Sequence, residues 1–175
     1  MSRLLAVDPG IRGCGVALFE GRTLCLAKYV ENPIRRGDDL EAQLAMAHAV
    51  WALSDHRTPV DLVVVEWPQV YQGSKQKGDP RDLLTLAGVD AAICCMVLAV
   101  ARTRYLPAEW KGQVPGDLMC CRVVGCEAMA CKKHAPVLPG KLSSTELLCC
   151  QHQPQGKFHN VADAIGIGLK HLGRL

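Results

Sequence analysis

Apolar runs at the start of the chain predict three consecutive β-strands. Residues 3–7 form a short hydrophobic run that ends at Asp8, and two further strand-like runs follow at 14–20 and 23–30. The sequence Glu20-Gly21-Arg22 between the last two runs is a hairpin signal. The simplest arrangement is therefore an antiparallel meander of three strands.

The next part of the chain alternates between helix and strand. Residues 38–53 have apolar side chains at helical spacing and acidic residues at the start, which predicts a helix. Residues 60–65 are continuously apolar, as is typical of a central strand covered on both faces, and the run ends in Glu66. The expected buried face of the helix comprises Leu40, Leu44, Ala47, Val50 and Trp51.

A second helix and a fifth strand follow a polar loop at 70–79. Asp79 and Pro80 have the residue types of an N-cap and a first helical position. We expect this helix to continue to about Val100 and a buried strand to occupy 103–107.

The C-terminal part is expected to be mainly helical, with an apolar periodicity over 159–172 that predicts a last helix. A helix over 115–131 and a weak one over 143–151 are also expected. The order of elements predicts a mixed α/β fold with one central sheet. We expect residues 1–175 to form a single domain.

The composition is that of a globular protein, with 49% apolar and 21% charged residues. The net charge of +3 is too small to indicate nucleic-acid binding by itself. The longest apolar run, 91–101, is too short to span a bilayer, so no membrane association is expected. We expect a cytoplasmic protein whose ten cysteines are reduced. Four of them lie in apolar runs and are predicted to be core residues: Cys14, Cys25, Cys94 and Cys95.

A cysteine-rich group at 120–134 is a candidate zinc site. Its ligand types are suitable, but it lacks a C-x2-C pair. The spacing therefore argues against structural zinc, and metal analysis of the purified protein would decide. The group comprises Cys120, Cys121, Cys126, Cys131 and His134.

Three carboxylates follow a common pattern. Asp8 ends the first strand, Glu66 ends the fourth, and Asp163 stands in the apolar last helix between two alanines. A carboxylate beside a packing face is costly unless it is paired or binds a metal, and three like charges do not satisfy one another. Taken singly, each has an ordinary structural explanation. Taken together they favour a site for a divalent cation such as Mg²⁺.

Four sequence blocks stand out along the chain: AVDPGIRGCGVALFE, VVVEWPQVY with the downstream DLLTLAGVDAAI, YLPAEWKGQVPGDLM, and HNVADAIGIGLKH. In this order they resemble the RuvC family, the Holliday junction resolvases of the RNase H-like superfamily found in bacteria and some of their phages. The resemblance implies an RNase H-like sheet of five strands, three antiparallel and then two parallel, flanked by helices. It also implies a homodimer that acts on four-way DNA.

By this resemblance Asp8, Glu66 and Asp163 match metal-binding carboxylates, with Asp8 at the centre. A fourth family position, three residues before the last carboxylate, is Asp or His, but this chain has Asn160. Asn offers a neutral oxygen and holds Mg²⁺ more weakly. Three explanations stay open: natural tolerance, compensation by the adjacent His159, or a disabled site.

DNA contacts are expected in the loop after Glu66. Its basic residues suit phosphates, and its tyrosine could stack on bases at a junction. A solvated loop is the alternative. Lys111 resembles a family basic residue near the scissile phosphate, and we expect it to belong to the catalytic set. The loop residues are Tyr71, Lys75, Lys77 and Arg81.

These features predict an endonuclease of DNA recombination and repair that resolves Holliday junctions by phosphodiester hydrolysis with Mg²⁺, or with Mn²⁺ in its place. Two alternatives stay on the same fold: a flap or fork nuclease, and a junction-binding protein whose cleavage is impaired by Asn160. An actin-like ATPase would need a second domain, for which 175 residues leave no room.

Overall fold

A computed structural model describes residues 2–34, 39–54, 59–69, 79–110 and 158–173. The predicted helices and loops within 111–157 lie outside these residues. The elements are β1 (Arg3–Asp8), β2 (Gly13–Glu20), β3 (Thr23–Glu31), α1 (Asp39–Leu53), β4 (Val60–Glu66), α2 (Pro80–Met96), β5 (Ala99–Tyr105), α3 (Pro107–Trp110) and α4 (Phe158–His171).

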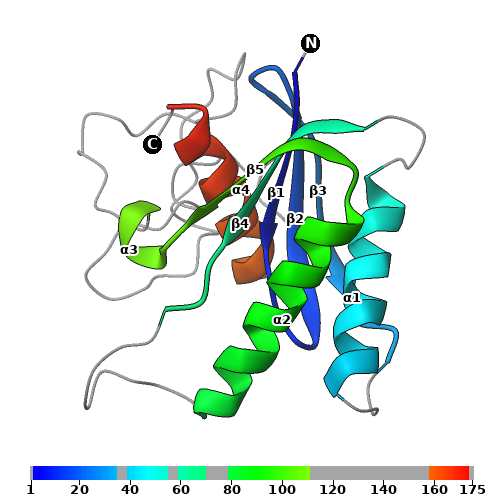
Figure 1. Ribbon diagram of the computed structural model, residues 1–175. Coiled ribbons are helices and arrows are strands. Elements are labelled where there is room, and N and C mark those ends of the chain that lie inside the picture. The colour runs from blue at the N-terminus through cyan, green and yellow to red at the C-terminus, as the bar shows by residue number, and fades with distance from the viewer. Residues whose placement is uncertain (1, 35–38, 55–58, 70–78, 111–157, 174–175) are drawn as a thin grey trace.

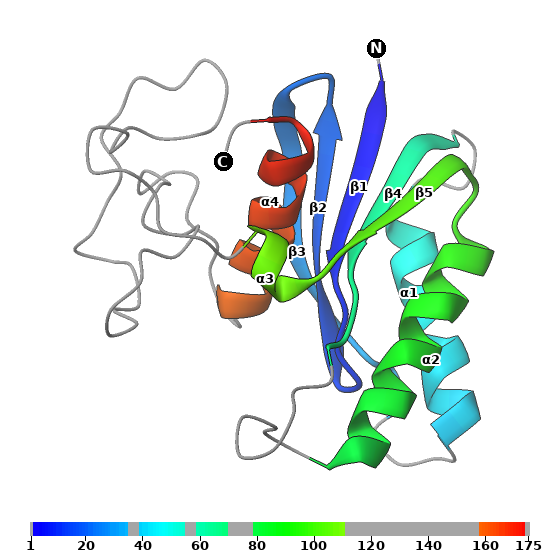
Figure 2. The same ribbon diagram turned by 60° about the vertical axis from the view of Figure 1, so that its left-hand side comes forward.

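The strands form one mixed sheet in the order β3-β2-β1-β4-β5. β1 pairs antiparallel with β2, and β2 pairs antiparallel with β3. β4 is parallel to both β1 and β5. This topology confirms the predicted five-stranded sheet with three antiparallel strands followed by two parallel ones. Helices α1 and α2 cover one face of the sheet, and α4 covers the other (Figures 1 and 2).

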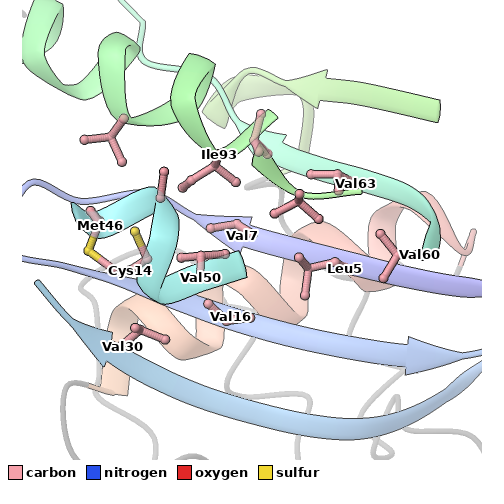
Figure 3. Packing of buried hydrophobic residues seen from close by; sticks show 14 of the residues in the cluster. Leu5, Val7, Cys14, Val16, Val30, Met46, Val50, Val60, Val63 and Ile93 are labelled. Atoms are coloured by element: carbon pink, nitrogen blue, oxygen red, sulfur yellow. The ribbon is translucent and has the colours of Figure 1, made fainter. Parts of the chain in front are cut away.

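Alternating residues of the central strands supply two separate cores. On β1, Leu5 and Val7 pack with the residues of α1 and α2, including Val50 and Ile93 (Figure 3). Leu4 and Ala6 belong to the other core, beneath α4. β4 alternates in the same way, because Val63 and Val65 lie in the first core and Val64 in the second. The continuous apolar run of β4 is therefore explained by burial on both faces, as its sequence predicted.

The predicted end of the second helix and start of the fifth strand were wrong. α2 ends at Met96 rather than near Val100, and β5 begins at Ala99 rather than at 103. The C-cap residue Val97 is extended. The Arg102 guanidinium donates to the carbonyl oxygens of Cys94, of Val97 at 3.2 Å and of Ala99 at 3.3 Å. These bonds satisfy carbonyls at the helix end and join it to β5.

Two predictions about buried residues also need correction. In α1 the buried residues are Met46, Ala47 and Val50, whereas Leu40 and Leu44 are 62% and 48% exposed. Those two leucines lie in the first half of α1, where the apolar spacing continues although the side chains face outward.

The four described cysteines are free thiols, and they are not all the core residues that the sequence predicted. Cys14 is buried and Cys94 half-buried, whereas Cys25 and Cys95 are exposed. Among the described residues, no helix is long and apolar enough to cross a membrane.

Candidate metal centre

Asp8 and Glu66 are brought together by neighbouring parallel strands. Both are the last residues of their strands, and parallel neighbours end at the same edge of a sheet. The alternation along each strand continues through these positions, which places both side chains on the α4 face, opposite α1 and α2. Asp8 is buried and Glu66 is half-buried.

α4 supplies the third carboxylate because its first turn lies very close to β2. Gly15 is the register partner of Asp8 on β2. A Cβ atom at Gly15 would collide with the backbone carbonyl of Asn160. Only glycine therefore permits this approach, which sets Asp163 beside Asp8.

The three carboxylates form a compact group. One ligand oxygen from each of Asp8, Glu66 and Asp163 lies within 4.8 Å of the others. Hard divalent cations such as Mg²⁺ and Mn²⁺ prefer carboxylate oxygens, and such an ion would offset the mutual repulsion of the three charges. The donor set thus fits the divalent metal that the sequence predicted. Its three carboxylates come from segments that are far apart in the chain.

Asn160 contacts this group as a hydrogen-bond donor. Its Nδ2 donates to Oδ2 of Asp8 over 3.0 Å. An aspartate at this position would offer an oxygen instead, and two carboxylates would then face each other. The amide therefore stabilises the charge of Asp8. The sequence predicted a metal ligand at position 160 and did not indicate this role as a donor.

Trp110 is a second neutral donor that sequence reasoning missed. The side chain is only 6% exposed, and its Nε1 donates to Oε2 of Glu66 over 2.8 Å. The signal in the sequence was weak, because a tryptophan near a basic residue predicts a core position as readily as a site position.

Asp90 is a further acidic residue that the sequence reasoning did not single out. It lies on α2, across the sheet from α4, and is fully buried. Within the part of the chain that the structure describes, neither of its carboxylate oxygens has a hydrogen-bond partner. Burial, reinforced by the charges of Asp8 and Glu66, raises the pKa of Asp90 to about 8.

The Cys14 thiol is also kept neutral. It donates to the carbonyl oxygen of Gly10 over 3.7 Å, and burial raises its pKa to about 12. Its predicted place in the core is confirmed.

The other predicted site residues are only partly described. Arg81 is exposed in the first turn of α2, where its backbone N–H donates to the Asp79 side chain that caps the helix. His159 lies in α4, but its side chain is outside the described part of the chain. Also outside it are Tyr71, Lys75, Lys77, Lys111 and the cysteine-rich group 120–134.

Comparison with solved structures identifies the architecture. RuvC from T. thermophilus in complex with a Holliday junction substrate aligns with a TM-score of 0.59 over 98% of this chain and 92% of that chain, at 18% sequence identity. The chain has the RuvC fold. A second structure of Thermus thermophilus RuvC aligns with a TM-score of 0.56, covers 97% of this chain and 92% of that chain, and is 19% identical.

The sequence itself matches no protein-family model, and no curated protein matches it. The RuvC fold is therefore established by the structure, and the sheet and helices that the resemblance implied are present. Within that fold the three clustered carboxylates occupy the edge where β1 and β4 end.

Proposed function

We propose that this chain is a divalent-metal-dependent endonuclease that cuts branched DNA, with the four-way junction as its substrate. The observation that carries the proposal is the convergence of Asp8, Glu66 and Asp163 from three separate elements of a RuvC fold. A structural neighbour, T. thermophilus RuvC, is in complex with a Holliday junction substrate. DNA recombination and repair are the processes that need such an activity.

The three carboxylates would hold Mg²⁺ or Mn²⁺. A bound ion supplies Lewis-acid stabilisation of charge on the phosphate and lowers the pKa of water, which favours hydrolysis. Asp8 would be the central ligand of the ion, because its strand β1 lies between β2 and β4. Asn160 and Trp110 would keep the carboxylates of Asp8 and Glu66 in place through their N–H groups.

We further propose that basic residues outside the metal centre neutralise the DNA backbone. Arg81 is exposed at the start of α2, and an exposed guanidinium suits a contact with a DNA phosphate. The other proposed contacts are Lys111, Tyr71, Lys75 and Lys77, which follow from the resemblance. Each such lysine or arginine, replaced by alanine, should weaken junction binding and reduce its salt dependence.

A homodimer would place two metal centres on one junction. Leu84 on α2 is 76% exposed, and Leu40 and Leu44 on α1 are exposed as well. α1 packs against α2, so these leucines belong to one layer of the molecule. Exposed apolar groups of this kind support association with a second copy. Sedimentation of wild-type protein and of Leu84→Glu tests the dimer.

We propose a cytoplasmic location for this activity, as expected from the sequence.

The decisive test uses labelled four-way junctions, flaps, forks and linear duplexes with Mg²⁺ or Mn²⁺. We expect symmetric cuts in the four-way junction, none in the linear duplex, and no cutting in EDTA. Asp8→Asn should abolish cutting while junction binding persists. Cutting by Asp8→Asn would contradict the proposal. Preferential cutting of flaps or forks would identify the protein as a nuclease for those substrates instead of for four-way junctions.

The second candidate is a junction-binding protein with weak cleavage. Its support is the hydrogen bond from Asn160 to Asp8, which shows position 160 acting as a neutral donor rather than an anionic ligand. Tight junction binding with slow cutting in both metals would favour it.

A further inference from the structure

The short helix α3 ends in a tryptophan that reaches the candidate metal centre. The helix is capped at its start, because the Glu109 side chain accepts from the backbone N–H of Leu106 over 2.6 Å. The Glu109 backbone N–H donates in turn to the Leu106 carbonyl over 2.9 Å. Pro107 at the first helical position suits this geometry. The four residues are therefore a defined turn that fixes the direction in which Trp110 points.

The ring of Trp110 is held by the core beneath α4. It belongs to the buried cluster that contains Ala6, Val64 and Ile165. Figure 2 shows α3 beside α4 on this side of the sheet, and the two helices are in contact. Tryptophan buries a large ring and carries one polar atom, so a buried tryptophan needs a place for its N–H group.

Trp110 directs this N–H to a metal-centre carboxylate. The indole has one donor and no acceptor, and its donor lies 2.8 Å from Oε2 of Glu66. A hydrogen bond to a carboxylate is stronger than one between neutral groups. Because the ring cannot shift within the core, the bond restricts the rotation of the Glu66 carboxylate.

We propose that Trp110 is a positioning residue of the metal centre, which holds Glu66 in the orientation that binds the divalent ion. The proposal rests on the metal-dependent activity proposed above. Lys111, the proposed phosphate contact, follows Trp110 directly in the sequence.

Trp110→Phe is the informative variant, because it keeps an aromatic ring in the core and removes the N–H group, together with part of the larger indole ring. Partners that orient metal ligands typically contribute about 10–100-fold to metal affinity or activity. We expect Mn²⁺ to bind Trp110→Phe at least about tenfold more weakly than wild type, measured by calorimetry without DNA. The concentration of Mn²⁺ needed for half-maximal cutting should rise by a similar factor.

Tyr105→Phe is the matched control. The Tyr105 side chain packs against the same core, and its hydroxyl lies 3.2 Å from Nδ1 of His171, the last residue of α4. The variant loses one aromatic hydrogen bond and should leave the Mn²⁺ affinity unchanged. A loss of Mn²⁺ affinity in Trp110→Phe but not in Tyr105→Phe supports positioning of Glu66 by the indole N–H. An equal loss of Mn²⁺ affinity in both variants would indicate an effect of core packing instead.

A fluorescence measurement keeps the test valid if Trp110→Phe fails to fold. The chain has three tryptophans, so Trp51→Phe with Trp67→Phe leaves Trp110 as the single emitter. Mn²⁺ should quench this emission in a saturable manner, with the same midpoint as calorimetry. No quenching at Mn²⁺ concentrations that saturate the protein would overturn the proposal.

The two proposals fail in different ways. Wild-type protein that binds no Mn²⁺ overturns the metal-dependent function and, with it, the role of Trp110. Wild-type protein that binds Mn²⁺ while Trp110→Phe binds it equally well overturns the role of Trp110 alone.

Discussion

The side-chain amide of Asn160 and the carboxylate of Asp8 lie 3.0 Å apart, with Nδ2 of the amide donating to Oδ2. The two residues are 152 positions apart in the chain and meet because the first turn of α4 rests on β2. The bond gives the central carboxylate a neutral partner in a group of three negative charges. Asn160 therefore helps to hold the carboxylate of Asp8 in place within this group.

The first prediction concerns Asn160→Asp. Without metal, this change replaces a favourable bond with the repulsion of two carboxylates, and the free energy of unfolding should fall by about 1–3 kcal/mol. With Mn²⁺ the added anion becomes a ligand, so the protein should bind the ion more tightly and recover stability. Urea unfolding in EDTA and in excess Mn²⁺ measures both effects.

The same variant distinguishes the explanations of the natural asparagine. A large gain in junction cutting would identify a disabled site, whereas unchanged cutting would indicate natural tolerance. Asn32→Asp is the control, because the Asn32 amide donates to the backbone carbonyls of Ile11 and Ala42 and not to a carboxylate. Its loss of stability should be the same with and without Mn²⁺. Asn160→Asp that is more stable than wild type in EDTA would contradict the prediction.

The second prediction concerns the close approach of α4 to β2. Gly15→Ala would push the backbone of Asn160 away from Asp8, so both stability and Mn²⁺ affinity should fall. Overpacking of this kind typically costs about 1–3 kcal/mol. Gly168→Ala, farther along α4, is the matched control, because its added methyl group would collide with the ring of Phe19 on β2. That variant should lose stability and keep its Mn²⁺ affinity. A loss of Mn²⁺ affinity in both variants would show that the contact at Gly15 is not specifically required for metal binding.

The positions of Asp8 and Glu66 could be predicted because strand patterns are local. Each residue interrupts an apolar run, and adjacent parallel strands end at one edge. Asp163 could be predicted from a charge within an apolar helix. The resemblance then joined the three residues into one site, which the structure brings within 4.8 Å.

Trp110 and Asp90 could not be predicted in the same way, since their importance depends on what lies across the fold. The indole partner of Trp110 is 44 residues away. The apolar run after Met96 also gave no sign of the helix end, because Arg102, which reaches back to it from β5, looks like an ordinary surface residue in the sequence.

The third prediction follows from that arginine. Arg102→Met removes the donors to the end of α2 while keeping the aliphatic part of the side chain. We expect a loss of about 1–3 kcal/mol in the free energy of unfolding, since bonds to a charged donor are among the stronger ones. Arg104→Met is the control on the same strand. Its guanidinium lies 4.8 Å from the Trp67 ring centroid at an exposed position, where such contacts contribute about 0.5–1 kcal/mol. Equal losses would contradict the capping role of Arg102.

The last prediction concerns the buried Asp90 and the pH dependence of stability. The pKa of Asp90 is raised from 3.8 to about 8, with burial as the main cause. Between these values the folded protein keeps a proton that the unfolded chain has lost. The contribution of Asp90 to stability must therefore fall as pH rises through this range and level off above about pH 8.

Asp90→Asn has nearly the same shape and does not ionise. Its stability relative to wild type should increase with pH, by up to about 1.4 kcal/mol for each pH unit between the two pKa values. Urea unfolding in EDTA, at several values between about pH 4 and pH 9, measures the difference. Asp82→Asn, at an exposed position of the same helix, is the control for the loss of a charge. A constant difference between Asp90→Asn and wild type would show that Asp90 ionises normally, and that the carboxylates of Asp8 and Glu66 exert no effect across the sheet.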